Sequence, residues 1–458
     1  MILKNVVKEE FKINSIVSSK MEDMIDTYGK IYAGSPNWVN VEDGIKTINF
    51  AKSVCSETAR LALLGTKITI GGGAKAEYLQ KQIDNVYYKL REWTEYGCAY
   101  GTIVLKPNGA SVDCILPNNF IVTDQSNGEI TGIVFINKET SEDGKRYYTR
   151  LEYHRFEEDG IYVITNKCYV SKVDGEKGKM IDIKQTPWKE LDEEVAIQNI
   201  EKPLYGVLRM PQANNVDIGS SLGLSIFSDA IEELKDLDIA YSRNAEEIGD
   251  SRRTVLIDSD RLLPSGTKVR NSIRGFERTR DEMKLPKYVK AISGTGNEDI
   301  YHEINPNLNT DTRLTGINAL LSQIGYKIGF SNGYFVFNES TGMITATQVD
   351  SDDRRTIQFI KDIRDQIEKC LNGLIDAISI FADLYDVVSV GEYEVVYDFG
   401  DITYNLEEDR KRWWGYVVQN RVPAWKYFVK FEGMSEEEAK AMVMEAQEKE
   451  PTLFGLEE

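Results

Sequence analysis

Histidine is scarce in this sequence, with only His154 and His302 among 458 residues. Neither has a metal-ligand or catalytic-triad partner at a recognisable spacing, so the sequence gives no support for catalysis by a Ser/His or Cys/His pair. His154 falls inside the alternating run RLEYHRF, which predicts a strand residue rather than a general base. His302 is predicted to lie in a polar turn. Enzymes that depend on histidine are therefore disfavoured.

Cysteine is also sparse, and the five thiols are scattered without a CxxC pair (Cys55, Cys98, Cys114, Cys168 and Cys370). This pattern disfavours a disulfide framework or a zinc site and favours reduced, buried thiols. No run of eighteen apolar residues occurs, so no membrane span is expected. Charges interrupt the N-terminal MILKNVVKEEFKINS, unlike a signal peptide, and we expect the protein to stay inside the cell that makes it.

Phosphate and metal motifs are missing as well. Gly71-Gly72-Gly73 followed by Lys75 lacks the GxxxxGK[ST] order, so a glycine turn between strand and helix is favoured over a phosphate cradle. Two acidic groups invite the hypothesis of a nuclease magnesium site, but nothing supplies the other ligands, and acids in the first turn of a helix are explained by its dipole. These groups are Asp350, Asp352 and Asp353, and separately Asp398 and Asp401. We expect no metal and no cofactor.

Basic residues are outnumbered by acidic ones, 55 to 74. The resulting net charge of −19 argues against a protein that coats nucleic acid. The segment from Ser251 to Ile292 is an exception, since eleven Lys and Arg against five acids give it +6 and leave −25 for the rest. A solvated surface with ion pairs and a binding surface are both compatible with this segment.

What is present is a folded chain, with 41% apolar and 28% charged residues. Residues 1–222 combine helical periodicity with short β-rich runs separated by Gly, Asn and Asp turns, and one helix is expected from Ala76 to Tyr96. The fold class is therefore α+β. From Ser221 an apolar stripe predicts a helix of about seven turns that ends at Gly249. Its members are Phe227, Ile231, Leu234, Leu237, Tyr241, Ala245 and Ile248.

A second such stripe follows at Leu314, Ile317, Leu321, Ile324 and Ile328. These two helices bracket the basic segment, which reads as a small insertion on a helical stalk. The loop FSNGYFVFNESTG and the junction GMITATQVDSDDRRT come next, and then a long helix is expected from about Thr347 to Leu384. Thr345 or Thr347 is its predicted cap. The strand-like EYEVVYDFG and terminal helices complete the chain.

This order of parts resembles that of tailed-bacteriophage portal proteins, in particular those of phages of Gram-positive hosts. Two segments carry the resemblance, RLEYHRFEEDGIYVITNKCYVS and GYKIGFSNGYFVFNESTGMITATQVDSDDRRTIQ. The second resembles the family's passage from stem through tunnel loop to long helix, where a Thr-Ala-Thr-Glu-Val run is usual. Gln348 replaces that glutamate here, a mild departure. The resemblance covers nearly the whole chain.

The resemblance implies a portal fold with a wing in residues 1–222, stem helices in 223–250 and 309–329, and a small α/β clip in 251–308. It further implies a tunnel loop in 330–346, a long wing helix and returning strand in 347–404, and a helical crown in 405–458. Portals are rings, usually of twelve subunits, through which double-stranded DNA enters and leaves the capsid. The implied partners are other copies of the chain, the terminase large subunit, the major capsid protein and scaffold, and a head-tail connector. The implied location is the virion, after assembly in the host cytoplasm.

Two sets of site residues follow from the resemblance. The tunnel loop would present Asn332, Gly333, Phe335, Phe337, Asn338, Glu339, Gly342 and Met343 to DNA or to a neighbouring subunit, although the FVF alternation equally fits a hairpin core. The clip would use basic side chains for terminase, adaptor or DNA: Arg252, Arg253, Lys268, Arg270, Arg274, Arg278, Arg280 and Lys284. A portal is not an enzyme. The rival hypotheses are a phage nuclease or NTPase on the same helices and, disfavoured by the acidic balance, a host DNA-binding regulator.

Overall fold

The structure is a computed structural model that describes residues 2–40, 42–109, 111–157, 160–250, 254–258, 269–270, 277–278, 289–292, 301–304, 310–336, 354–400, 406–419, 421–432 and 434–448. It divides into two compact units, Met1–Asp398 and Phe399–Glu458. The first unit combines helices with antiparallel sheets, so the predicted α+β class is confirmed. None of the described helices has the length and apolar composition that a membrane crossing requires.

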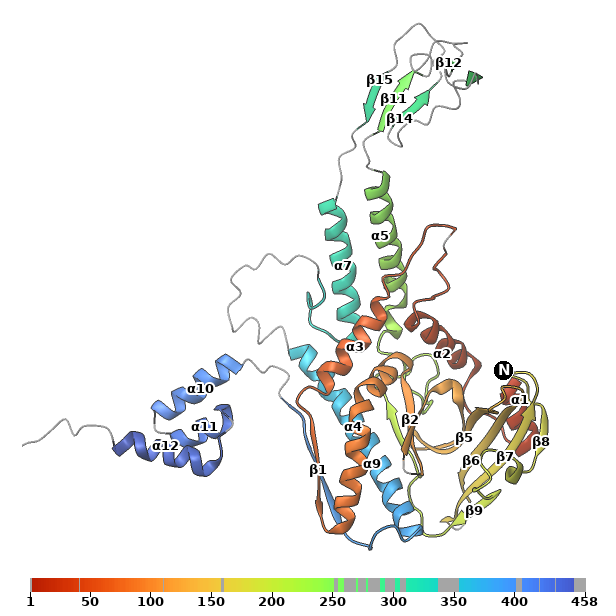
Figure 1. Cartoon of the computed structure of the whole chain (residues 1–458), viewed down its shortest axis with the longest axis vertical. Helices are drawn as coiled ribbons and strands as arrows, with labels where there is room; N and C mark the ends of the chain where they lie inside the picture. The colour runs from red at the N-terminus through yellow and green to blue at the C-terminus, as the bar shows by residue number, and fades with distance from the viewer. Residues whose placement is uncertain are drawn as a thin grey trace, which may run out of the picture. The chain divides into compact units, whose positions relative to one another are not determined.

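The largest described sheet has the strand order β4-β5-β6-β7-β8, and β9 also pairs with β7 (Figure 1). Its strands are β4 Phe120–Ser126, β5 Glu129–Thr140, β6 Tyr147–Phe156, β7 Tyr162–Ser171, β8 Lys179–Ile181 and β9 Glu194–Ile197. Both faces are covered. Ile133 and Phe135 of β5 pack with Met21 and Ile25, whereas their neighbours Val134 and Ile136 pack with Val6 and Val7. Alternate side chains of a strand point to opposite faces, so the run ITGIVFIN serves two cores.

Two N-terminal helices supply those covers, α2 Ser19–Tyr32 on one face and α1 Ile2–Phe11 on the other. A third helix, α3 Phe50–Ala62, packs on α4 instead. The hydroxyl of Ser18 accepts a hydrogen bond from the amide of Met21 and caps α2. Met21, Ile25 and Tyr28 are buried, as the helical period of this segment predicted.

A second layer is formed by long helices and two small sheets (Figure 1). One sheet has the order β10-β2-β3, and in the other β1 pairs antiparallel with β16. The strands are β1 Lys67–Gly72, β2 Thr102–Asn108, β3 Ser111–Ile115, β10 Gly206–Arg209 and β16 Tyr393–Asp398. The helices α4 Ala74–Tyr100 and α9 Arg354–Leu384 pack on them. Gly206 of β10 lies so close to the backbone carbonyl of Cys370 in α9 that a Cβ would not fit there.

Some predicted boundaries were wrong. The helix expected from Ala76 to Tyr96 is α4, which extends further at both ends, to its C-cap at Gly101 with φ +80°. The stalk helix α5 begins only at Ile231, after the 3-10 turn Ser228–Ala230. The apolar residues before it are buried in non-helical backbone that hydrogen-bonds to the end of α4, where the amide of Ile226 donates to the carbonyl of Cys98. Tertiary packing thus overrides the helical pattern.

Short strands lie between the two stalk helices. β11 (Thr254–Asp258) pairs parallel with β14 (Val289–Ile292) and antiparallel with β15 (Tyr301–Ile304). β12 (Val269–Arg270) pairs with β13 (Glu277–Arg278). His302 lies in β15 opposite Leu256, so its prediction as a turn residue was wrong. Pairing with a distant strand decided this, and it is not visible in the local sequence.

The second unit consists of α10 Leu406–Val418, α11 Ala424–Glu432 and α12 Glu436–Glu448 in its described part. Aromatic rings join α10 and α11, with Trp413 and Phe431 centred 6.0 Å apart. Ser435 caps α12, because its hydroxyl accepts from the amide of Glu438 and Glu438 accepts in return from the amide of Ser435. The helices predicted at the end of the chain are confirmed.

Candidate functional site

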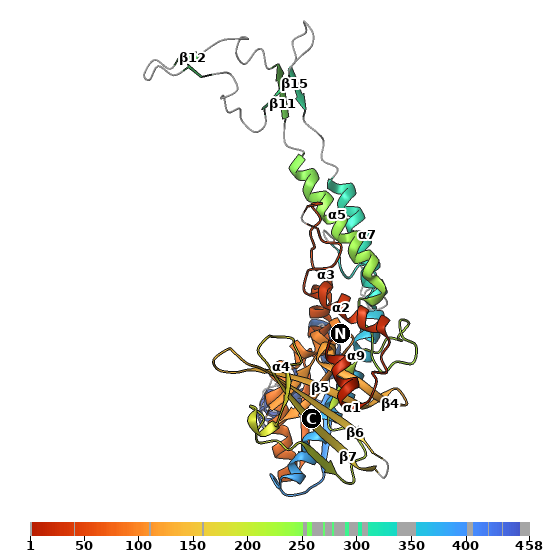
Figure 2. The same ribbon diagram turned by 90° about the vertical axis from the view of Figure 1, so that its right-hand side faces the viewer.

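Two helices, α5 (Ile231–Asp250) and α7 (Thr310–Ile328), lie side by side and form what we call the helical stalk (Figures 1 and 2). Glu247 pairs with Arg313 at one end and Glu233 with Lys327 at the other. The predicted stripe of α7 is buried at Ile317, Leu321, Ile324 and Ile328. Ion pairs near both ends and buried apolar side chains between them therefore hold the two helices together.

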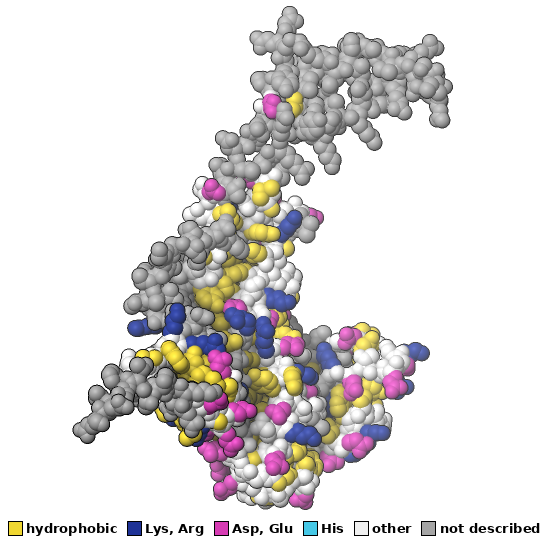
Figure 3. Space-filling view, turned by 60° about the vertical axis from the view of Figure 1, so that its left-hand side comes forward, with side chains coloured by type: hydrophobic (Ala, Val, Ile, Leu, Met, Phe, Trp, Pro, Cys, Tyr) yellow, Lys and Arg dark blue, Asp and Glu magenta, His cyan; other side chains and the backbone are white. Residues whose placement is uncertain are grey.

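The stalk is asymmetric in charge and in burial. α5 carries seven acidic against two basic side chains, whereas α7 carries one acidic against two basic. Its predicted apolar stripe divides as well: Leu234 and Leu237 are buried, but Tyr241 is 39% and Ile248 52% exposed. Figure 3 shows hydrophobic side chains at the surface of the stalk. One chain alone therefore leaves part of this apolar face uncovered.

Asp238 anchors a loop to the stalk. Its carboxylate is buried and accepts hydrogen bonds from the Trp38 indole at 2.9 Å and the Ile48 amide at 2.9 Å. One turn later the Ser242 hydroxyl exchanges hydrogen bonds with the backbone of Lys46. Burial raises the pKa of Asp238, although its hydrogen bonds oppose this. The loop between α2 and α3 is thereby held along α5.

The base of the predicted tunnel loop is pinned to α9. The amide of Ser331 donates to the hydroxyl of Thr356 at 2.9 Å, and that hydroxyl donates to the Ser331 hydroxyl at 3.0 Å. The Arg355 guanidinium lies 3.8 Å from the ring centroid of Tyr326 and donates to its carbonyl. These contacts join the end of α7 to the start of the described part of α9.

A group of rings, which we call the aromatic cluster, fills the space beside this base: Phe50, Phe330, Tyr334, Phe335 and Phe359. The Tyr334 hydroxyl donates to Glu57 of α3 at 2.7 Å. Glu57 is also paired with Arg60, and mainly for that reason its pKa is lowered. The cluster therefore packs residues 330–335 against α3 and α9.

Three predicted tunnel-loop residues fall within the described chain. Asn332 is exposed in a turn, and Gly333 adopts φ +81°, which favours glycine. Phe335 is half-buried in the aromatic cluster, and residues 332–335 form turns and bends. Its contact with DNA stays a prediction. The remaining residues of this set, Phe337, Asn338, Glu339, Gly342 and Met343, and the cap residues Thr345 and Thr347, lie outside the described residues.

The predicted basic set is described only in part. Arg270 lies on β12 opposite Glu277, and Arg278 lies on β13 opposite Val269. Arg252, Arg253, Lys268, Arg274, Arg280 and Lys284 lie outside the described residues, as do Asp350, Asp352, Asp353 and Asp401 among the acids. A binding role for the basic segment stays a prediction.

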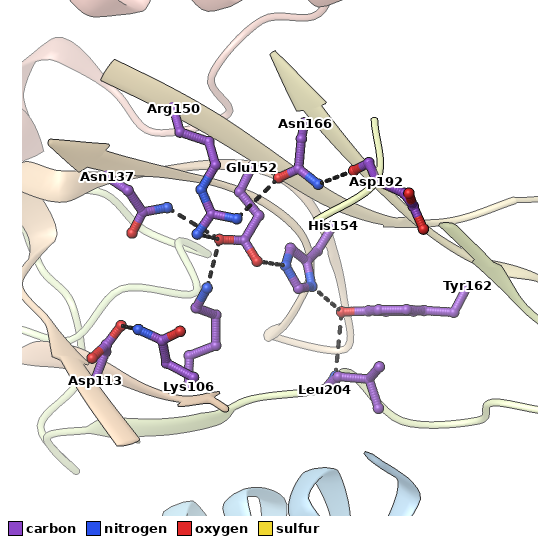
Figure 4. Close-up of polar contacts among 11 residues, drawn as sticks. Lys106, Asp113, Asn137, Arg150, Glu152, His154, Tyr162, Asn166, Asp192 and Leu204 are labelled. Atoms are coloured by element: carbon purple, nitrogen blue, oxygen red, sulfur yellow. Dashed lines mark hydrogen bonds and ion pairs between the residues drawn. The ribbon is translucent and has the colours of Figure 1, made fainter. Parts of the chain in front are cut away.

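His154 belongs to a group of polar side chains that we call the buried charge cluster (Figure 4). Glu152 accepts from Lys106, pairs with Arg150 and meets a ring nitrogen of His154 at 3.0 Å. The other ring nitrogen lies 2.9 Å from the Tyr162 hydroxyl. Burial alone would raise the pKa of Glu152, but Lys106, His154 and Arg150 hold it well below its usual range. His154 is 1% exposed on β6, which confirms its prediction as a strand residue.

The glycine triplet links β1 to α4, as predicted, but Gly71 and Gly72 still pair as residues of β1, and only Gly73 lies in the bend between the two elements. Gly72 adopts φ +143° beside the carbonyl of Glu392, and Gly73 is the N-cap of α4. Lys75 is buried and pairs with Asp383 at 2.6 Å, so its ammonium group is directed to α9. Among the described residues, no group of three His, Cys, Asp or Glu is arranged to hold a metal ion.

Comparison with protein-family models shows which family the chain belongs to. A model described as "Phage portal protein, SPP1 Gp6-like" matches residues 39–445. The chain belongs to this phage portal family. The match includes the helical stalk, the aromatic cluster and the buried charge cluster. Because the family is one of structural proteins, the portal assignment agrees with the prediction that the chain is not an enzyme.

Other comparisons add little to the portal assignment. A chain from the "Virion of native gene transfer agent (GTA) particle" is similar to this portal chain at 10% sequence identity and a TM-score of 0.39. The similarity covers 94% of this chain and 99% of that one. The comparison with curated proteins gave no match. The family model therefore carries the assignment.

Sequence reasoning missed several residues that organise this portal chain. Asp238, Ser331 and Thr356 hold the loops around the stalk, yet none belongs to a motif. The signal for Asp238 is an acid between Leu237 and Ile239 on the buried side of a helix. Such an acid needs a partner, and here the partner is more than 180 residues away in sequence.

Proposed function

We propose that this portal chain assembles into a ring of about twelve subunits at one vertex of a phage capsid, and that double-stranded DNA passes through the axial channel during packaging and ejection. The match of the portal family model to residues 39–445 carries this proposal. In this role the protein is part of the virion and is assembled in the cytoplasm of the host.

The charge of the chain supports a conduit. DNA that must slide cannot be held at any one site, because each neutralised phosphate adds salt-dependent affinity. Each subunit carries −19, and α5 has five more acidic than basic side chains. A ring of acidic stalks repels the duplex and keeps it mobile.

The exposed apolar residues of the stalk support assembly. Tyr241 and Ile248 continue the stripe that Leu234 and Leu237 bury within the chain. In a ring, the neighbouring subunit covers this part of α5. Burial of such side chains contributes roughly 25 cal/mol per Å² of apolar area.

The parts of the chain are assigned within this proposal. Residues 1–222 are the wing, 223–250 and 309–329 the stem, and 251–308 the clip. Residues 330–346 are the tunnel loop, 347–404 the long helix with the returning strand, and 405–458 the crown. The clip receives the terminase large subunit and the head-tail connector through its basic residues, and the wing and crown meet the major capsid protein and scaffold.

Electron microscopy of the purified full chain tests the proposal. We expect rings of twelve or thirteen subunits with a central channel, and mass photometry should give the matching mass. Ile248→Asp should shift the population toward monomers, whereas Glu232→Gln at an exposed position of the same helix should not. A strictly monomeric chain at high concentration contradicts the ring. ATP hydrolysis or DNA cleavage by the purified chain alone would favour the nuclease or NTPase alternative instead.

A further inference from the structure

The second unit buries almost none of its own apolar side chains. In its described part it consists of the helices α10, α11 and α12 (Figure 1). Among these described residues only Ala439 is buried, and α11 has no buried residue although six of its nine residues are apolar. Trp414 is 47% and Val418 67% exposed. Because large exposed apolar patches mark contact surfaces, this unit is incomplete as a single copy.

A groove of about 440 Å³ lies between α10 and α11. Two basic side chains and three aromatic rings line it: Arg410, Lys411, Trp414, Tyr427 and Phe428. The rings of Trp414 and Tyr427 are centred 5.1 Å apart and pack edge to face, so the aromatic wall is formed before any partner binds. Arg410 is paired with Glu432 at 3.0 Å. Lys411 is exposed, and no ion pair joins it to a side chain that the structure describes.

The exposed side of α10 carries a stripe that continues this groove. Lys411, Trp414 and Val418 are three and four residues apart, so they share one face of the helix. The segment from Arg410 to Lys430 contains six basic residues and no acidic one. The surface therefore presents a positive charge, a ring and an aliphatic side chain in that order.

The exposed face of α12 has the opposite charge. This helix carries five acidic residues against one basic residue. Glu437, Ala441 and Met444 are exposed, are four and three residues apart and share one face. Ala439 is buried on the other side, where α12 packs on α11. The exposed face therefore points away from α11, so a copy cannot place it in its own groove.

These two surfaces match in charge, size and spacing. Each stripe spans seven residues, or about two helical turns. When α12 of one copy lies parallel to α10 of another, opposite charges meet at one end, a small residue faces a large one in the middle, and two apolar side chains meet at the other end. The pairs are Glu437 with Lys411, Ala441 with Trp414, and Met444 with Val418.

A DNA duplex matches only part of the same groove. Lys411 suits a phosphate, but the bases of a duplex are stacked inside it and give Trp414 and Val418 no apolar partner. An acidic helix with an exposed methionine supplies both kinds of contact, because the thioether packs well on aromatic rings. The groove and its stripe therefore favour a helix over a duplex.

We propose that α12 of one subunit binds the groove of the next subunit, parallel to its α10, and so joins the second units of neighbouring copies head to tail. A contact between two different patches of the same chain is the kind from which a ring is built. This inference rests on the proposed ring and names a contact within it.

Charge reversal in the full chain tests the contact. Lys411→Glu brings two carboxylates together, so the concentration at half-assembly, measured by mass photometry, should rise at least about tenfold. Adding Glu437→Lys to the same chain should return it to within about threefold of wild type. Both residues are exposed, so the melting temperature of the monomer should stay unchanged in each variant. A double variant that assembles no better than Lys411→Glu overturns the inference.

A pair of methionines on α12 provides a matched comparison. Met444→Asp places an unpaired charge in the contact and should also weaken assembly at least about tenfold. Met442 is 43% exposed and lies two residues before Met444, so it points to another side of the helix. Met442→Asp should change assembly less than about twofold. Equal effects of the two substitutions contradict the assigned face.

Cross-linking shows which copies are joined. Rings built from chains labelled with light and heavy nitrogen are treated with a carbodiimide, which links an amine to a carboxylate. We expect a peptide that joins Lys411 of one isotope to Glu437 of the other. Links within one isotope alone place the contact inside a single chain and overturn the inference.

Two further outcomes separate this contact from other roles of the surface. Duplex DNA that binds the wild-type monomer but not Trp414→Ala, while Met444→Asp assembles normally, overturns the inference in favour of a DNA surface. Rings of Met444→Asp that form at the wild-type concentration overturn it and leave the proposed ring intact. A wild-type chain that never forms rings refutes both.

Discussion

Ser331 and Thr356 are 25 residues apart in sequence, yet the amide of Ser331 donates to Oγ1 of Thr356 at 2.9 Å. The same Thr356 hydroxyl donates onward to the Ser331 hydroxyl at 3.0 Å. Both residues are buried, so water does not replace these bonds. The pair joins the described start of the predicted tunnel loop to the first described turn of α9.

Thr356→Val should lower the free energy of unfolding by about 1–3 kcal/mol, because the shape is kept while a buried amide loses its acceptor. Urea denaturation measures this. Thr315→Val is the matched control, since the Thr315 hydroxyl bonds the Asp311 carbonyl at an exposed site. That control should change stability by less than about 0.5 kcal/mol. Equal effects of the two variants would show that the Ser331 contact adds nothing.

Asp238→Asn should change how stability depends on pH. Burial raises the pKa of Asp238, so the folded chain keeps this proton over a window that starts near the ordinary value of about 3.9. In that window the unfolded chain binds fewer protons, and the free energy of unfolding falls as pH rises. The stability advantage of wild type over Asp238→Asn should therefore shrink with rising pH. Denaturation of both proteins from pH 4 to 7 tests this, and a widening difference contradicts it.

Arg364→Met should destabilise the end of α3. This arginine of α9 is 6% exposed and donates to the carbonyls of Ala62, Leu61 and Leu64. Loss of a charged donor to such carbonyls costs about 1.5–3 kcal/mol. Faster amide exchange around residues 61–66 should accompany the loss. Arg354→Met at the exposed start of α9 should leave both measurements close to wild type.

His154 should make the protein less stable in mild acid. Burial lowers its pKa, although Glu152 opposes the shift. Below the ordinary value of about 6.5 the unfolded chain takes up a proton that the folded chain refuses, so the free energy of unfolding falls from pH 7 to pH 5. His154→Gln should lose this contribution, and its gap to wild type should narrow as pH falls. In wild type, the His154 NMR signals should show no titration near pH 6.5.

Local patterns predicted much of the fold. The strand run RLEYHRF and the buried stripe of α7 depend on neighbours in sequence, and both are confirmed. The start of α5 was predicted wrongly because Leu224 and Ile226 serve a distant core, and a helical spacing cannot reveal that. His302 was misplaced for the same reason.

The candidate site was less predictable than the fold. Asp238 with Trp38, Arg364 with Ala62 and Tyr334 with Glu57 are each about 200 or more residues apart. Such pairs depend on how the helices pack, and no single segment of the sequence contains that information. The resemblance to portals supplied the order of the parts but not the side chains that hold them together.

The pairing of β1 with β16 also determines when the first unit can finish folding during synthesis. Lys67 pairs with Asp398, so the edge of β1 has no partner until almost the whole first unit has left the ribosome. At roughly 5–20 residues per second, the roughly 330 intervening residues take roughly 20 to 60 s. During that interval an unpaired strand is open to pairing with other nascent chains. The first unit is thus completed late in synthesis. β1, the first strand to be made, is therefore the strand that most needs protection by host chaperones.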